Sequence, residues 1–268
     1  MISVVCSTYR MGGLDVLFHG LRSQTHKDFE LVLVDGIKDW RGIDVTYLGE
    51  KFDVPTVRTC PEPNPFPTFS FGRCYNAGLD AASGDFLYFV CDFTVLQPDA
   101  LERAARHFKD NSRVGYMGCQ DFYSCPPLHP EFPRYAGRTY AHFGQSPDLG
   151  RYVDDLRTGA LDRFGWSVFD DYYCGQSLDP CPVQSGLDPK LQMSDGPVGA
   201  DFFHCANQAV PAGLARFDES LDGAHGQHDI RFARACGIPF TLDRDNVAAI
   251  VNPRPHFPEL RQDREPNR

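Results

Sequence analysis

The sequence predicts an α/β protein in which helices flank a mixed, mostly parallel sheet, with a long irregular insertion. Short apolar runs alternate with segments of helical periodicity over residues 1–120, and this alternation is typical of parallel sheets. Residues 121–197 lose both periodicities and are rich in Pro, Gly, aromatic and acidic residues. Strand and helix patterns return after residue 200, so the irregular stretch is predicted to be an insertion.

Most of the predicted elements lie before residue 121. Strands are predicted over residues 2–6, 29–34, 45–48 (the weakest), 85–92 and 114–119. Helices are predicted where apolar or small residues recur at helical spacing, over residues 14–21, 74–81 and 99–108. The helix over 74–81 presents only small side chains at these positions, so we expect it to lie close against the sheet.

The rest of the chain is predicted to complete the same domain. Residues 121–197 are expected to build part of a binding surface, because long irregular segments in compact domains are usually functional. A helix is predicted over residues 228–236 and a last strand over 247–251, and the polar tail 259–268 is expected to fray. No linker divides the chain, so residues 1–268 are predicted to form one domain.

Composition excludes several classes of protein. The chain is 42% hydrophobic and 23% charged, a balance that excludes disordered, collagen-like and coiled-coil proteins. Its 36 acidic and 26 basic residues give a net charge of -10, which disfavours nucleic acid as a partner. The apolar start, residues 1–5, is too short for an export signal, and no stretch approaches the roughly 20 residues of a membrane span. We therefore expect a soluble, cytoplasmic protein without a transmembrane segment.

Cysteine usage and missing motifs narrow the classes further. The ten cysteines are expected to stay reduced in the cytoplasm. A structural zinc site on Cys119, Cys125, Cys174 and Cys181 is a minor alternative, because their spacing is wide for such a site. The chain has no GxGxxG loop, Walker motif or GxSxG elbow, which disfavours dinucleotide redox enzymes, P-loop NTPases and α/β-hydrolases.

Polar side chains follow three of the predicted strands. Thr8, Tyr9 and Arg10 come after the first strand, Asp35 ends the second, and Asp92 ends the strand over 85–92. Ligands of open α/β sheets bind beyond the carboxyl ends of the strands. We therefore expect these five side chains to line one rim.

These residue types suit a nucleotide. Asp35, a short carboxylate at a strand end, can accept a hydrogen bond from the imide N–H of uracil. Its alternative role is in a turn, because Asp-Gly is a common turn pair. Tyr9 can stack on the base or ribose, or simply pack. Arg73, on the helix that includes residues 74–81, can face a pyrophosphate or an acidic neighbour; its alternative is a solvated surface arginine.

Five segments, in this order, resemble family 2 glycosyltransferases of the GT-A (Rossmann-like) fold. They are SVVCSTYR (3–10), SQTHKDFELVLVDG (23–36), Arg73-x-x-Asn76-x-Gly78, Ala82-Ser-Gly-Asp85 and FDESLDGAHGQHDIRFAR (217–234). The resemblance implies transfer of a sugar from a nucleotide-diphosphate donor, a UDP-sugar, to a hydroxyl acceptor, with inversion by direct displacement. Residues 1–120 would bind the nucleotide sugar and residues 121–258 the acceptor.

The resemblance also implies a divalent cation, Mn²⁺ or Mg²⁺, to neutralise the departing diphosphate. The family pattern is Asp-x-Asp, whereas this chain has Cys91-Asp92-Phe93 with a single carboxylate. Asp92 would be one ligand. His256 would be another, because many relatives carry a metal-binding His in the loop after the last strand; its alternative is an exposed residue in a Pro-rich turn. Without a metal, Arg73 would stabilise the diphosphate.

The predicted base lies at the start of the helix over 228–236. Relatives have an acidic pair there, and this chain has His228-Asp229. The resemblance implies that Asp229 takes the acceptor proton; the alternative is an Asp that stabilises the helix dipole. His228 would hold an acceptor or phosphate, or act as the base if Asp229 only orients it.

Two other functions stay open at this point. The missing second Asp and the missing Glu before Asp229 allow a sugar-nucleotide-binding protein with degraded catalysis. A nucleotidylyltransferase is less favoured, because residues 7–13 lack a Gly-rich, basic loop. The acceptor is open between a polysaccharide, a lipid carrier, a protein side chain and a hydroxylated nucleic-acid base, and the oligomeric state is open as well.

Overall fold

A computed structural model describes residues 1–8, 14–36, 46–60, 71–92, 94–123, 193, 196–222 and 227–251. The strands are β1 (Ile2–Thr8), β2 (Phe29–Asp35), β3 (Thr56–Thr59), β4 (Phe86–Cys91), β5 (Thr94–Val95), β6 (Gly115–Tyr123), β7 (Gly196–Val198), β8 (Gln208–Pro211) and β9 (Phe240–Val251). The helices are α1 (Leu14–Arg22), α3 (Thr46–Phe52), α4 (Phe71–Ala81), α5 (Ala100–Asp110) and α9 (His228–Cys236), with 3-10 turns η2 (Ala200–Phe202) and η3 (Glu219–Leu221).

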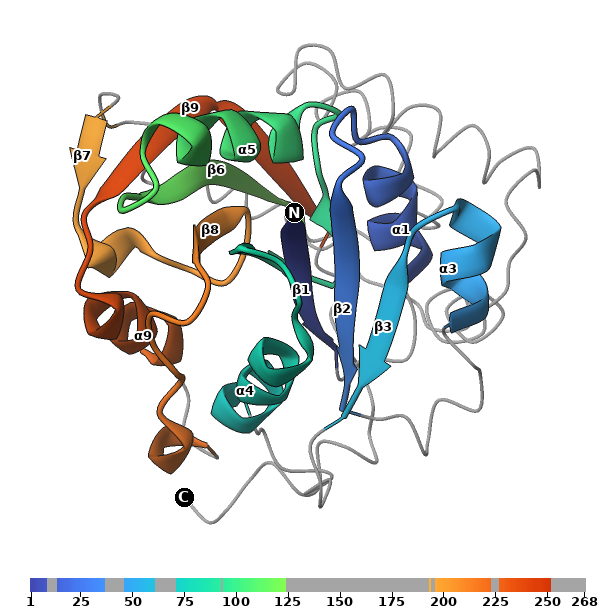
Figure 1. Cartoon of the computed structure of the whole chain (residues 1–268), viewed down its shortest axis with the longest axis horizontal. Helices are drawn as coiled ribbons and strands as arrows, with labels where there is room; N and C mark the ends of the chain where they lie inside the picture. The colour runs from blue at the N-terminus through green and yellow to red at the C-terminus, as the bar shows by residue number, and fades with distance from the viewer. Residues whose placement is uncertain are drawn as a thin grey trace, which may run out of the picture.

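In the described residues all nine strands belong to one sheet, in the order β3-β2-β1-β4-β8-β6-β9-β5 with β7 paired to β9 (Figure 1). Strands β3, β2, β1 and β4 are parallel. Strand β8 runs antiparallel between β4 and β6, and β6 is parallel to β9. The prediction of a mixed, mostly parallel sheet flanked by helices is confirmed.

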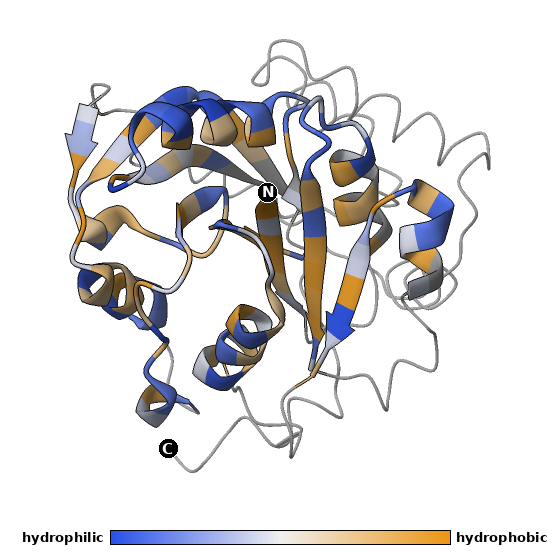
Figure 2. Cartoon of the chain, in the orientation of Figure 1, coloured by the Kyte–Doolittle hydropathy of each residue, from blue (hydrophilic) through white to orange (hydrophobic). Residues whose placement is uncertain are grey.

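The sheet separates two hydrophobic cores. Alternate side chains of a strand point to opposite faces, so Val4 of β1 packs with α1, α3 and α5, whereas Val5 packs with α4 and α9. Figure 2 shows that the central strands β1 and β2 are largely hydrophobic, as expected for strands covered on both faces. Helices α4 and α9 therefore share one face of the sheet.

Helix α4 lies close to the sheet, as its small residues predict. A Cβ at Gly78 would come within 2.8 Å of Val5 and 2.9 Å of Val34. Because real Cβ atoms do not approach so closely, only glycine permits this separation of helix and sheet. The first turn of α4 is thereby fixed relative to the ends of β1 and β2.

The prediction of a strand over residues 45–48 is wrong. The described part of this segment begins helix α3, and the strand that pairs with β2 is β3, over 56–59. Leu48 and Phe52, one helical turn apart, are both buried, and the Phe52 ring stacks on Phe18 with centroids 6.0 Å apart. Burial against α1 thus decides in favour of a helix, which the short apolar run alone did not reveal.

The second half of the fold differs from the prediction at its boundaries. Strand β6 continues to Tyr123, past the expected end at residue 119, and β9 begins at Phe240 instead of 247. Strand β8 was not predicted, because four residues without alternation give no strand signal. Apart from Met193, residues 124–195 of the expected insertion lie outside the described residues. In the described part of the chain, no helix is long and apolar enough to span a membrane.

Candidate active site

Three predicted site residues meet where β1, β2 and β4 end. Thr8 lies opposite Asp35 in the register of β1 and β2, and the Gly36 N–H donates to the Thr8 carbonyl oxygen at 2.9 Å. On the other side of Thr8, its hydroxyl donates to Asp92 Oδ2 at 3.0 Å. All three side chains are buried. The common rim predicted for Thr8, Asp35 and Asp92 is therefore present, whereas Tyr9 and Arg10 lie outside the described residues.

Asp35 has an ion-pair partner on the neighbouring strand. Arg58, in β3, donates to Asp35 Oδ2 at 2.9 Å, and the Asp35 side chain is fully buried. A buried carboxylate needs such a charged partner. The contact fixes the orientation of the Asp35 carboxylate at the end of β2.

The N-terminus of α4 lies at the same edge. In a strand-helix-strand unit the helix runs back along the sheet, so its start lies near the carboxyl ends of the strands. Two backbone N–H groups of its first turn, at Gly72 and Arg73, donate to Asp222 at 2.6 and 3.1 Å. The Arg73 guanidinium is half-exposed and 3.9 Å from Glu219, an acidic neighbour of the kind predicted for it.

The segment that contains Asp222 is clamped onto α4 by Asn76. The Asn76 side chain donates to the Phe217 carbonyl oxygen at 3.0 Å and accepts from the Phe217 N–H at 2.8 Å. It also donates to Glu219 at 2.8 Å. Asn76 of the Arg-x-x-Asn-x-Gly motif therefore joins α4 to the start of the segment 217–234, which contains α9.

Helix α9 places His228 and Asp229 beside this clamp. The His228 ring is buried and lies tilted against the Phe71 ring, with centroids 5.0 Å apart. Its Nε2 is 3.7 Å from Asp222 Oδ1. Asp229 Oδ1 accepts the Ile230 N–H at 3.1 Å, and Asp229 Oδ2 lies 3.5 Å from His204 Nδ1. His228 is thus packed between α4 and Asp222, whereas the Asp229 side chain is 22% exposed.

Asp229 is also connected to the end of β4. The Cys91 thiol, next to Asp92 in the chain, donates to the Cys205 carbonyl oxygen at 3.3 Å. His204, the residue before Cys205, contacts Asp229. A run of contacts and of residues adjacent in the chain therefore leads from Asp35 through Thr8 and Asp92 to Asp229. The adjacent pairs are Asp92 with Cys91 and Cys205 with His204.

The electrostatics keep the Asp229 carboxyl ionised. Burial acts to raise the pKa of Asp229, but the hydrogen bond and charge of His204, with the N–H groups of Asp229 and Ile230, lower it below the ordinary value.

Burial raises the pKa of the Tyr75 hydroxyl, and the Asp92 carboxylate acts in the same direction. Tyr75 of α4 thus lies within electrostatic reach of Asp92.

The described residues do not by themselves fit a divalent cation. Asp92 is 2% exposed and accepts the Thr8 hydroxyl, and no three His, Cys, Asp or Glu side chains in the described ranges are grouped to hold a metal. His256 lies outside those ranges, as do Cys125, Cys174 and Cys181 of the zinc alternative; Cys119 is buried in the sheet. The cation stays a prediction.

Comparison with known proteins gives structural neighbours only. No family model and no curated protein matches the chain. The structure of S. aureus TarS 1-349 in complex with UDP superposes with a TM-score of 0.58 at 14% identity, over 93% of this chain and 60% of that chain. The complex of the same protein with UDP-GlcNAc gives 0.58 at 13%, over 95% and 59%. The chain has the GT-A fold.

The match to the GT-A fold covers only part of the neighbour. The chain spans 60% of the TarS 1-349 structure and 38% of a further S. aureus TarS structure, to which it is 13% identical with a TM-score of 0.56. At 13–14% identity, the similarity to these structures supports a shared fold and nothing more. The roles of individual residues therefore depend on the contacts described above.

Three residues of this candidate site were not predicted from the sequence: Arg58, Asp222 and His204. Arg58 has a weak signal, because a strand assignment over 56–59 would have placed it beside the end of β2. Asp222 lies inside the segment 217–234 that carried the resemblance, but nothing local indicates that it caps α4. His204 has no sequence signal, since its contact with Asp229 spans 25 positions of the chain, from 204 to 229.

Proposed function

We propose that this chain is a glycosyltransferase that moves a sugar from a UDP-sugar to a hydroxyl acceptor. The observation that carries the proposal is the run of contacts from Asp35 to Asp229 along the carboxyl edge of a GT-A sheet. Ligands of open α/β sheets bind at this edge. The S. aureus TarS structures in complex with UDP and UDP-GlcNAc support a uridine nucleotide as the donor.

The side chains divide the work of the transfer. Asp35, oriented by Arg58, accepts the imide N–H of uracil; a carboxylate has capacity for several donors. Asp229 takes the proton of the acceptor hydroxyl while its oxygen attacks the anomeric carbon. The bond between that carbon and the diphosphate breaks on the opposite side, which inverts the configuration. Arg73 stabilises the charge of the departing UDP.

A divalent cation, where bound, would neutralise the diphosphate, and Asp92 with His256 would be its ligands. Asp92 is buried, and its carboxylate accepts one hydrogen bond from the Thr8 hydroxyl. Comparison of the activity with and without Mn²⁺ tests the involvement of the cation.

The direct test is release of UDP from a panel of UDP-sugars, with and without Mn²⁺. We expect UDP release from at least one donor, with water as the acceptor, and a higher rate if the cation binds. Donor binding without any release would instead favour a sugar-nucleotide-binding protein with degraded catalysis. The single carboxylate after β4, where the family pattern has two, is the observation that favours this alternative. Release of pyrophosphate would identify a nucleotidylyltransferase.

Asp35→Asn should weaken UDP binding and relax the choice of base. The neutral amide loses the stronger hydrogen bond of a charged acceptor, so the Kd for UDP is expected to rise about tenfold. Cytosine carries an acceptor where uracil carries the imide N–H, so the asparagine N–H₂ can serve CDP. Calorimetric titration of both nucleotides measures the ratio of the two Kd values.

A matched control for this variant lies at the other end of the same strand. Asp28→Asn changes an exposed carboxylate at the start of β2, 69% exposed, near the N-terminal amine. It should leave both nucleotide affinities unchanged. An unaltered ratio of UDP to CDP affinity in Asp35→Asn would remove Asp35 from base recognition.

A further inference from the structure

His204 is held rigidly beside Asp229. Its backbone N–H donates to Gln208 Oε1 at 2.6 Å, and its carbonyl oxygen accepts the Ala206 N–H at 2.5 Å. The following residue, Cys205, is buried and receives the Cys91 thiol at its carbonyl oxygen. The turn before β8 thus presents the half-exposed His204 ring, 3.5 Å from Asp229 Oδ2.

The other charged groups near Asp229 are engaged elsewhere. On α9 itself, Arg231 lies 3.5 Å from Asp218 and Arg234 lies 2.5 Å from Asp201. His228 faces Asp222, as described above.

The two buried thiols at α9, those of Cys205 and Cys236, stay neutral. Burial raises the pKa of the Cys205 thiol well above its usual range, with the Asp229 carboxylate adding to the effect. Burial likewise raises the pKa of Cys236 to about 12. Among the described residues, His204 is therefore the side chain that can offer Asp229 both a hydrogen bond and a positive charge.

We propose that His204 is a positioning residue for Asp229: its ring fixes one carboxylate oxygen, while the Ile230 N–H fixes the other. This inference rests on the proposed function, in which Asp229 is the base. The two contacts hold the carboxylate in one orientation. Each oxygen keeps a second lone pair, which can receive a hydrogen bond from the hydroxyl of the sugar acceptor. The half-buried site would otherwise favour the protonated acid, which cannot act as a base.

The sign of the expected pH effect follows from this arrangement. Without His204, burial still raises the pKa of Asp229 while the opposing contact is gone, so the pKa must increase. A base must be ionised to act, so the acid limb of the pH profile of kcat moves to higher pH. A purely structural role of His204 would lower kcat or stability without moving this limb.

The experiment compares His204→Ala, His204→Gln and the control His26→Ala in UDP release from the donor that gives the highest rate. His26 lies in the turn before β2, at the amino end of that strand, where its ring is 3.1 Å from the Asp28 carbonyl oxygen. We expect His204→Ala to lower kcat about tenfold through misplacement of the base, with KM for the donor unchanged and the acid limb displaced upward. His204→Gln, whose amide can still donate, should recover most of kcat.

A second readout does not depend on turnover. The carboxyl ¹³C resonance of Asp229, assigned with Asp229→Asn, reports its pKa directly in the wild-type chain and in His204→Ala. A higher pKa in the variant supports the pairing even if no donor is hydrolysed, and an unchanged pKa overturns it. If Asp229→Asn stays active while this pKa still shifts, the assignment of Asp229 as the base fails and the pairing stands.

Discussion

Asp229→Asn is expected to abolish turnover while UDP still binds. Asparagine has the same shape and can keep the contact with the Ile230 N–H, at 3.1 Å in the wild-type chain, but it cannot take a proton. General base catalysis contributes about 10²- to 10⁴-fold, so kcat for UDP release should fall by that factor. The measurements are single-donor kinetics and calorimetric titration with UDP. The Kd for UDP should stay within about twofold, because the proposed uracil contact is made by Asp35 and not by Asp229.

A matched control and an alternative base sharpen this result. Asp201→Asn changes a carboxylate on the same side of the molecule, 64% exposed and paired with Arg234 of α9, and it should leave kcat unaltered. If Asp229→Asn kept its rate, His228 would be the remaining candidate at the helix start. The geometry argues against His228, because its ring is 3% exposed and wedged between Phe71 and Asp222.

The rim of the site is the part that sequence reasoning could place. Thr8, Asp35 and Asp92 each end a strand with a clear apolar pattern, and parallel strands bring their carboxyl ends to one edge. Local pattern and a general rule of topology were therefore sufficient. The small residues of α4 were equally informative, because Gly78 only makes sense in a helix that touches the sheet.

The connections between the two halves of the site could not be predicted. The contacts of Asn76 with Phe217, of Asp222 with Gly72 and of His204 with Asp229 join positions far apart in the chain. Each depends on how β8 pairs with β4 inside the sheet and on how α9 packs on the face of the sheet that carries α4. The prediction of a strand over residues 45–48 failed for a related reason, because contact with α1, and not the local sequence pattern, determines that this segment begins a helix.

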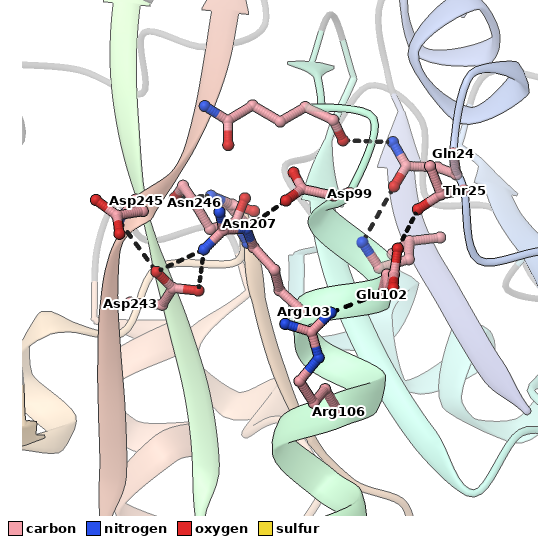
Figure 3. A network of polar contacts seen from close by, with 12 residues as sticks. Gln24, Thr25, Asp99, Glu102, Arg103, Arg106, Asn207, Asp243, Asp245 and Asn246 are labelled. Atoms are coloured by element: carbon pink, nitrogen blue, oxygen red, sulfur yellow. Dashed lines mark hydrogen bonds and ion pairs between the residues drawn. The ribbon is translucent and has the colours of Figure 1, made fainter.

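A buried polar network around Asn207 joins β4, β6 and β9 where β8 begins. Figure 3 shows two of its members, Asn207 and Asn246, next to Asp243. Asn207, just before β8, accepts the Tyr88 hydroxyl of β4 and donates to the carbonyl oxygens of Cys119 and Asn246, at 2.6 and 2.9 Å. The Asn246 amide donates to Tyr116 at 2.8 Å. Because Asn207 is fully buried and links β4, β6 and β9, its loss affects every strand around β8, and with them the turn that carries His204.

Asn207→Ala should therefore be the most destabilising of these substitutions. It leaves three buried partners without their hydrogen bond, at about 1 kcal/mol each. It also replaces Asn, which tolerates the left-handed backbone φ of +58° comparatively well, by Ala, which does not, at a cost of about 1 kcal/mol more. The free energy of unfolding in urea should fall by about 4 kcal/mol. Asn207→Gly, which tolerates this φ, should regain about 1 kcal/mol. The exposed Asn111→Ala is the control, and an equal loss there would refute the network's role.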